Sequence, residues 1–222
     1  MIIWAIVPVK PLGDSKSRLS HILPADERAI LTSTILKRTL KVLGKVQRVD
    51  KTLVVSRDTA VLKIARQHGA STYGETDRQG LNSALTRASH IAAAQRADCV
   101  MILPTDLPLL TPEDVGVMIS SVGESGRGNR NNHYYQKRAM AICSDHNDEG
   151  TNAMLVCPPN GFKFQYGPNS FSLHLEEAKR LEMDRRIVHT PGIKFDLDTE
   201  EDWNTYQAIQ GDAVALGQAV HG

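Results

Sequence analysis

Short apolar runs alternate with amphipathic stretches along most of this 222-residue chain. The runs have the length of β-strands and lie at 2–7, 52–56, 70–73, 99–103 and 139–143. Such alternation is typical of βα units, in which helices cover both faces of a largely parallel sheet. We therefore predict an α/β protein with a three-layer α/β/α fold and a mostly parallel, mixed sheet.

Between the runs, hydrophobic residues recur at helical spacing. Helices are predicted at 26–44, 59–68, 81–94, 111–122, 170–181 and from Glu200 onward, with a late strand at 193–197. The stretch 123–137 is rich in Gly, Asn and Arg and has no apolar period, which indicates a mobile surface loop. With 41% hydrophobic and 23% charged residues, the chain 1–222 has the composition of a single globular domain.

The overall charge and the cysteines exclude several classes of protein. A formal net charge of +1 argues against nucleic-acid binding, because proteins that neutralise many phosphates carry a clear basic excess. Cys99, Cys143 and Cys157 form no C-x-x-C pair, so we expect neither a disulfide framework nor a zinc site. The opening apolar run is too short to span a membrane and follows no basic leader. These features favour a cytoplasmic protein without a membrane partner and leave a homodimer open.

Three cations follow the first predicted strand within nine residues: Lys10, Lys16 and Arg18. In open α/β sheets, ligands bind beyond the carboxyl ends of the strands, where a loop can offer N–H groups and cations to a triphosphate. The P-loop pattern G-x-x-x-x-G-K-[ST] is absent, which disfavours a P-loop kinase or ATPase. The alternative is a solvated basic loop. The position after the first strand favours a phosphate site.

Aspartates mark two further places. Asp106 directly follows the strand predicted at 99–103, at the edge of the sheet where a carboxylate suits a hard cation such as Mg²⁺. Asp196 and Asp198 are two apart on a predicted strand, so they project to one face, where a metal ion would relieve their repulsion. The alternatives are turn formation by Asp106 and helix capping by Asp198 or Thr199.

This set of residues indicates a kind of reaction. A substrate phosphate is already an anionic nucleophile at neutral pH, so its transfer to a nucleotide needs positioning and charge neutralisation without a general base. Lys, Arg and Asp supply both. The chain has no G-x-S-x-G elbow and no H-E-x-x-H motif, which leaves hydrolase and metalloprotease functions with little support. We expect a metal-dependent nucleotidyltransferase that joins a nucleoside monophosphate to a small phosphorylated acid and releases pyrophosphate.

Over most of its length the chain resembles the 2-phospho-L-lactate and phosphoenolpyruvate guanylyltransferases of coenzyme F420 biosynthesis. The motifs that carry this resemblance are VPVK at 7–10, SKSRL at 15–19, GLNSAL at 80–85, PTDLP at 104–108, GTNA at 150–153, YGPNSF at 166–171 with His174, and DLDT at 196–199. Together and in this order they are specific, whereas each alone is weak. Ser15 and Tyr166 depart mildly from the family, whose members often carry Ala and Phe there.

The resemblance implies a Rossmann-like fold of the nucleotide-diphospho-sugar transferase type and one nucleotidyltransferase domain at 1–222. It also implies transfer of GMP from GTP to 2-phospho-L-lactate or phosphoenolpyruvate. The residues expected to act on the phosphates are Lys16, Arg18 and Asp106; those expected to hold Mg²⁺, or Mn²⁺ in its place, are Asp106, Asp196 and Asp198; those expected to bind the substrates are Lys10, Gly80, Asn82, Thr151, Gly167 and Ser170.

Other interpretations of these residues stay open. Thr151 and Ser170 could be helix N-caps, for which Ser and Thr are strongly preferred, and Asn82 could be an ordinary first-turn residue. The activity could also be that of a cytidylyl- or sugar-1-phosphate nucleotidyltransferase. A nucleotide-binding regulatory module without catalysis is the rival from another class, because a fold does not fix a function.

Overall fold

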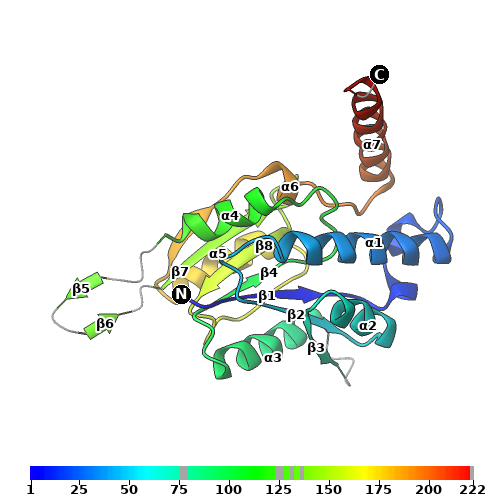
Figure 1. Ribbon diagram of the computed structural model, residues 1–222. Helices are drawn as coiled ribbons and strands as arrows, with labels where there is room; N and C mark the ends of the chain where they lie inside the picture. The colour runs from blue at the N-terminus through cyan, green and yellow to red at the C-terminus, as the bar shows by residue number, and fades with distance from the viewer. Residues whose placement is uncertain (76–79, 124–127, 131–132, 136–137, 221–222) are drawn as a thin grey trace.

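The computed structural model describes residues 1–75, 80–123, 128–130, 133–135 and 138–220, with side chains placed in all of these ranges except 128–130, 133–135 and 212–220. A seven-stranded sheet forms its centre, in the order β3-β2-β1-β4-β8-β7-β9 (Figure 1). The strands are β1 (Ile3–Pro8), β2 (Lys51–Ser56), β3 (Ser71–Gly74), β4 (Cys99–Ile102), β7 (Ala139–Ser144), β8 (Thr151–Cys157) and β9 (Asp184–Ile187). Within this sheet β8 runs antiparallel to both of its neighbours, and the other pairings are parallel.

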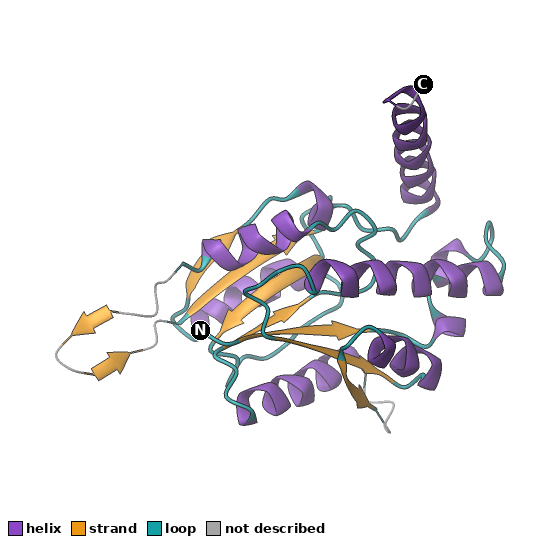
Figure 2. Ribbon diagram, viewed as in Figure 1, coloured by secondary structure: helices purple, strands orange, loops and turns teal. Residues whose placement is uncertain are grey.

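Helices cover both faces of the sheet (Figure 2). They are α1 (Ala25–Leu43), α2 (Thr59–Gln67), α3 (Leu81–Ala94), α4 (Pro112–Ser121), α5 (Ser170–Arg180), α6 (Pro191–Lys194) and α7 (Glu200–Val220), with 3-10 turns η1 (Leu12–Asp14) and η2 (Ser17–Leu19). Apolar residues of α1, α2 and α4 share one core with one face of the strands, and those of α3 and α5 share a second core with the other face. The predicted three-layer α/β/α fold with a mostly parallel, mixed sheet is confirmed.

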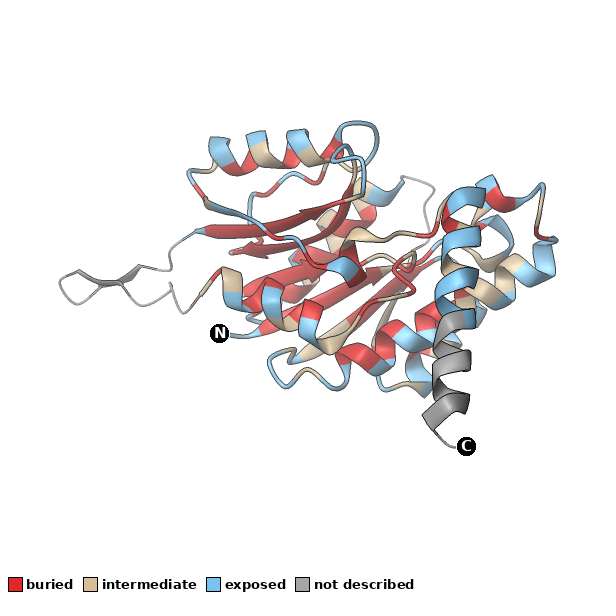
Figure 3. Ribbon diagram, turned by 90° about the horizontal axis from the view of Figure 1, so that it is seen from above, coloured by how far each residue is buried: buried red, intermediate tan, exposed pale blue. Residues whose placement is uncertain are grey.

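The central strands are apolar on both faces because each face meets a helical layer. In β1, Ile3, Ala5 and Val7 enter the first core, while Trp4 and Ile6 enter the second. Both sets are buried, as the red strands of Figure 3 show. Full burial on two faces produces a continuous apolar run, which is the pattern expected of central parallel strands.

Local capping sets where the helices begin. The Asp58 side chain accepts a hydrogen bond from Ala60 N and caps α2. Thr111 and Asp114 form a reciprocal capping box at the start of α4. The last helix, α7, leads away from the sheet (Figure 1). None of the helices in the described ranges combines the length and the hydropathy that crossing a lipid bilayer requires.

The prediction of a strand at 193–197 is wrong. Pro191–Lys194 forms the short helix α6, and 195–198 continues without regular structure. Pro191 is at the first helical position, where its fixed φ favours a helical turn, and this outweighs the β-branched and aromatic residues that follow. The sequence pattern also missed β8, which lies immediately before the loop leading to α5, and the short edge strand β9.

The loop predicted at 123–137 contains regular structure. Gly128–Arg130 (β5) and His133–Tyr135 (β6) pair antiparallel as a separate two-stranded sheet. A hairpin is defined by turn chemistry and backbone pairing, so the absence of an apolar period does not exclude it. The mobility of this segment stays a prediction.

The expectation that the cysteines stay unpaired is also wrong. Cys99 of β4 and Cys157 of β8 form a disulfide, with their Cα atoms 4.4 Å apart and a sequence separation of 58. The two strands are antiparallel neighbours, and directly opposite residues on such strands approach closely enough for a disulfide. Because β8 was not predicted, this proximity could not be inferred from the sequence. Cys143 is buried and free.

Candidate active site

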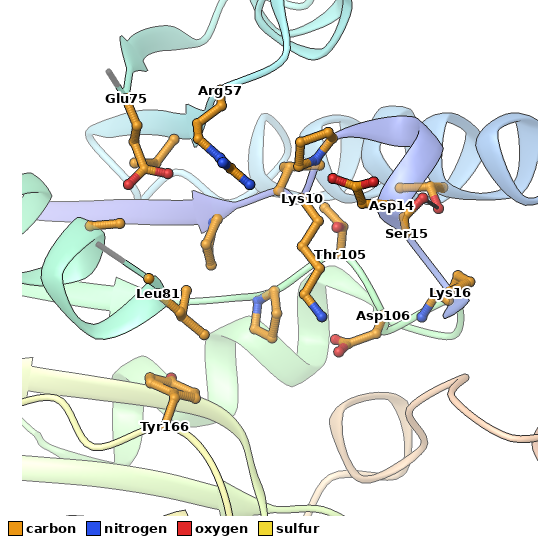
Figure 4. A pocket seen from close by; sticks show the side chains of 18 of the residues that line it. Lys10, Asp14, Ser15, Lys16, Arg57, Glu75, Leu81, Thr105, Asp106 and Tyr166 are labelled. Carbon is orange, nitrogen blue, oxygen red and sulfur yellow. Dashed lines mark hydrogen bonds between the residues drawn. The ribbon is translucent and has the colours of Figure 1, made fainter. Parts of the chain in front are cut away.

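A pocket of about 690 Å³ opens at the carboxyl edge of the sheet. It lies beyond the ends of β1, β2 and β4, next to the point where the strand order reverses, which is where open α/β sheets bind ligands. Since β8 is antiparallel, its first residue, Thr151, reaches the same edge. Lining residues include Lys10, Lys16, Arg57, Glu75, Leu81, Thr105, Asp106 and Tyr166, which are labelled in Figure 4. Gly80, Thr151 and Asp198 also line the pocket.

The loop after β1 brings two of its three cations to the pocket. The Lys10 side chain extends into it (Figure 4). Lys16 adopts a left-handed conformation with φ of 52°, and its buried amine donates to the Leu197 carbonyl at 2.5 Å and lies 3.6 Å from Asp198 Oδ1. Arg18 lies outside the lining, with a side chain that is 73% exposed and 3.5 Å from Asp198 Oδ2. The loop therefore places Lys10 and Lys16 at the pocket and leaves Arg18 at its rim.

Internal hydrogen bonds hold this loop in shape. The Ser15 hydroxyl donates to the Leu12 carbonyl at 2.7 Å and accepts from the Thr32 hydroxyl at 2.9 Å. The Arg28 guanidinium donates to the Ser15 carbonyl at 2.8 Å, and Leu12 N donates to Asp58 at 2.9 Å. The loop is thus tied to both α1 and α2, which makes it a preorganised wall rather than a free solvated segment.

Asp106 faces the pocket with a carboxyl group that is short of partners. Its Oδ1 is shielded from solvent and has no hydrogen-bond partner among the described residues. Burial raises the pKa of Asp106 to about 6; the nearby Lys16 charge opposes this, and the charges of Asp198 and Asp196 reinforce it. The Asp106 carbonyl accepts from Leu197 N at 2.8 Å, which ties the turn after β4 to the segment before α7. The alternative of a purely turn-forming aspartate leaves the free oxygen unexplained.

Asp196 and Asp198 do not share a strand face, because 195–198 is not a strand. Asp198 lines the pocket and pairs with Lys16 and Arg18. Asp196 is outside the lining; its Oδ1 accepts from Asn152 Nδ2 at 3.2 Å, and burial is the main cause that raises its pKa. The capping alternative holds for Thr199, whose hydroxyl accepts from Asp202 N at 3.2 Å at the start of α7.

The carboxylates of Asp106 and Asp198 suit a metal ion whose remaining ligands would be phosphate oxygens and water. Among the described residues, no group of three or more His, Cys, Asp or Glu side chains is arranged to hold a metal by itself. Asp106, with its unpartnered oxygen, and Asp198 nevertheless line the same pocket. Mg²⁺ is typically bound by one or two carboxylates together with substrate phosphates and water. Asp106 and Asp198 are thus the two predicted metal ligands that line the pocket, and Asp196 is not among its lining residues.

Polar groups of β8 and α5 form a buried network beside the pocket. The Ser170 hydroxyl donates to Thr151 Oγ1 at 3.3 Å, and Thr151 Oγ1 lies 3.0 Å from His174 Nδ1. Neither hydroxyl caps a helix: Thr151 begins β8, and Asn169 is the residue that precedes α5. Thr151 lines the pocket, whereas Ser170 does not line it and contacts Thr151 through their hydroxyl groups.

The remaining predicted site residues have separate positions. Gly80, with φ of 83°, precedes α3 and lines the pocket. Asn82 does not line it; instead its side chain clamps the Tyr166 backbone, accepting from Tyr166 N at 2.7 Å and donating to the Tyr166 carbonyl at 3.1 Å. Gly167, with φ of 137°, is exposed just after Tyr166 and is also outside the lining.

Three charged lining residues were missed by sequence reasoning: Asp14, Arg57 and Glu75. Arg57 directly follows β2 and Glu75 directly follows β3 (Figure 4). Burial is the main cause that raises the pKa of Glu75. Both strands were predicted, so the position of each residue at a strand's carboxyl end was a signal that could have identified it.

Comparisons with known proteins agree with this arrangement. Residues 3–212 match the family model described as "Guanylyl transferase CofC like". The chain is 36% identical over 211 residues to a phosphoenolpyruvate guanylyltransferase of Rubrobacter xylanophilus, covering 95% of this chain and 96% of that one. It is 31% identical over 198 residues to the protein of the same name from Sphaerobacter thermophilus, covering 89% of each.

A solved structure shows the same fold. A Desulfovibrio desulfuricans protein, which carries the name nucleotide-diphospho-sugar transferase, superposes with a TM-score of 0.69 at 16% identity, covering 93% of this chain and 87% of that one. At this identity the likeness concerns the fold alone. It confirms the expected nucleotide-diphospho-sugar transferase-like architecture.

Proposed function

Because the chain belongs to the family of CofC-like guanylyl transferases, we propose that it transfers GMP from GTP to phosphoenolpyruvate or 2-phospho-L-lactate and releases pyrophosphate. The two relatives named phosphoenolpyruvate guanylyltransferase, at 36% and 31% identity, support the first of these acids. The proposal includes a cytoplasmic role in coenzyme F420 biosynthesis, which the family resemblance suggests.

The distribution of charge across the pocket is the observation that carries the proposal. Lys10 and Lys16 approach from the loop after β1, while Asp106 and Asp198 lie beyond β4 and before α7. Thr151 adds a neutral hydroxyl from β8. Two polyanionic substrates would thus meet cations, candidate metal-binding carboxylates and a neutral hydrogen-bond donor in one place, as nucleotidyl transfer requires.

The chain's own groups orient the reaction. Lys10 and Lys16 attract the triphosphate and neutralise charge that develops on the departing pyrophosphate. Asp106 and Asp198 would hold Mg²⁺, or Mn²⁺ in its place, which would act there as a Lewis acid on the phosphates. The acceptor phosphate is already anionic, so the site needs no residue that removes a proton from the nucleophile. Asp198 is kept in place by Lys16 and Arg18, which gives Arg18 a supporting role at the rim.

The proposal is tested by pyrophosphate release from the purified protein. GTP, ATP, CTP and UTP are each combined with phosphoenolpyruvate, 2-phospho-L-lactate, glycerol 3-phosphate and glucose 1-phosphate, in the presence of MgCl₂. We expect release with GTP and the phosphorylated carboxylic acids, and none with glycerol 3-phosphate or glucose 1-phosphate, which lack a carboxylate. Turnover of glucose 1-phosphate in preference to both acids would replace this proposal with a sugar-nucleotidyltransferase.

A further inference from the structure

The Tyr166 hydroxyl is a buried polar group that lacks a hydrogen-bond partner among the described residues. Its oxygen is shielded from solvent, yet Tyr166 lines the pocket (Figure 4). A phenylalanine would fill the same volume without leaving a buried polar atom unsatisfied, and such atoms are costly. Because this hydroxyl is at the pocket, an atom of a bound substrate can be its hydrogen-bond partner.

The position of Tyr166 is held from two sides. The Asn82 side chain of α3 hydrogen bonds to both its N–H and its carbonyl, at 2.7 and 3.1 Å. The aromatic ring meets the His174 ring of α5 edge to face, with centroids 4.9 Å apart. The ring and its hydroxyl are therefore preorganised before a ligand enters, which is the condition for a selective contact.

His174 also determines what the Thr151 hydroxyl can do. Gln165 N donates to His174 Nε2 at 2.9 Å, so this nitrogen is unprotonated and the neutral ring carries its proton on Nδ1. Nδ1 then donates to Thr151 Oγ1 at 3.0 Å, and Ser170 donates to the same oxygen at 3.3 Å. Because Thr151 Oγ1 accepts both bonds, its own proton is available to a ligand in the pocket.

We propose that Tyr166 is a specificity-determining residue whose hydroxyl, together with that of Thr151, donates to the carboxylate of the acceptor acid. This inference rests on the proposed function. A phenol keeps its proton at neutral pH and is a donor there. Two neutral donors match the two oxygens of a carboxylate, whereas Lys10 and Lys16 suit the triphosphate. Tyr166 thus contributes to the selection of an acid over a simple phosphate ester.

Tyr166→Phe tests this with the loss of one oxygen atom. Phosphoenolpyruvate and 2-phospho-L-lactate are titrated calorimetrically into the protein with MgCl₂ and the α,β-methylene analogue of GTP, so that binding is measured without turnover. We expect Tyr166→Phe to raise Kd for the acid that binds wild type at least fivefold. In the activity assay it should raise KM for the acceptor by a similar factor and leave KM for GTP within twofold.

Tyr73→Phe is the matched control, because Tyr73 of β3 packs against the same core but does not line the pocket. It should bind the acids as wild type does. Ligand-free Tyr166→Phe should unfold at the wild-type temperature or above, which separates lost binding from lost folding. Unchanged acid affinity in a turning-over Tyr166→Phe variant overturns the inference alone. Wild-type protein that binds and turns over neither acid overturns both the inference and the proposed acceptor.

Discussion

At the scale of single residues, the carboxyl group of Asp106 is buried, which makes its charged form unfavourable. Burial raises its pKa to about 6, and one carboxylate oxygen lacks a partner among the described residues. A carboxyl group whose pKa is higher in the folded state than in the unfolded state favours folding at low pH, and that contribution is lost as the pH rises through the folded value. Above pH 6 the ligand-free protein is thus destabilised by its own candidate metal ligand. Proteins commonly tolerate such costs where function requires them.

Asp106→Asn should therefore stabilise the ligand-free protein. At pH 8 we expect the free energy of unfolding to rise by about 1 to 3 kcal/mol, because the shift of about two pKa units disappears with the charge. The gain should shrink as the pH falls from 6 towards 4. Urea unfolding at several pH values, with EDTA present, measures it. An asparagine variant that is less stable than wild type at pH 8 would contradict the assigned burial cost.

His174 should make stability fall in mild acid. Burial lowers its pKa to about 4, although Glu177 opposes the shift, and its Nε2 must stay unprotonated to accept from Gln165. Since the unfolded chain binds the proton more readily, stability is intact above pH 6.5 and is lost as the pH falls from 6.5 to 4, by roughly 3 kcal/mol in all. The comparison is urea unfolding of wild type and His174→Gln across this range. Equal pH dependence in the two proteins would show that His174 does not titrate as described.

At the scale of elements, apolar patterns predicted most of the sheet and its helices but neither β8 nor the short edge strand β9. The strands at 52–56 and 99–103 are continuous apolar runs between clear helices, so their pattern is unambiguous. In β8 the run begins with Thr151 and Asn152, whose polar side chains serve the pocket network and Asp196. The five residues at 153–157 are apolar, but no predicted helix precedes them, so this run lacks the alternation of strand and helix that identified the other strands.

The candidate site was predictable to a similar extent. The cations after β1 and Asp106 after β4 could be placed from their positions at strand ends. The clamp of Asn82 on Tyr166 joins residues 84 apart, and it depends on tertiary packing that no local pattern shows. The different surroundings of Asp196 and Asp198 depend on the end of α6, which the sequence pattern assigned to a strand.

The loop between β1 and α1 can be tested as a unit. Lys16→Ala should raise KM for GTP at least tenfold, equivalent to about 1.4 kcal/mol, because its amine lies at the pocket and holds Asp198. Arg18→Ala should have a smaller effect, since its exposed side chain reaches only the outer oxygen of Asp198. Lys63→Ala, on the exposed side of α2, is the control. Wild-type kinetics in folded Lys16→Ala would reduce the loop to a solvated surface.

At the scale of the whole molecule, one sheet brings distant segments to a single edge. β1, β4, β8 and the segment before α7 each place a site residue there, although these residues span 10 to 198 in sequence. Two interactions connect these segments directly. One is the hydrogen bond from Leu197 N to the Asp106 carbonyl, and the other is the Cys99–Cys157 disulfide between β4 and β8. The pocket is therefore a property of the complete fold, and no single motif contains it.

Product analysis tests the central claim, that this pocket transfers GMP to a phosphorylated acid. Wild type and Asp106→Asn are incubated with GTP, MgCl₂ and phosphoenolpyruvate or 2-phospho-L-lactate, and the products are identified by mass spectrometry and ³¹P NMR. We expect wild type to form the guanylylated acid, with a diphosphate bond and one pyrophosphate per product, and EDTA to abolish it. The folded Asp106→Asn variant should lose at least a hundredfold in rate, about 2.7 kcal/mol. Full activity of that variant, or GTP consumption without a guanylylated acid, would contradict the account.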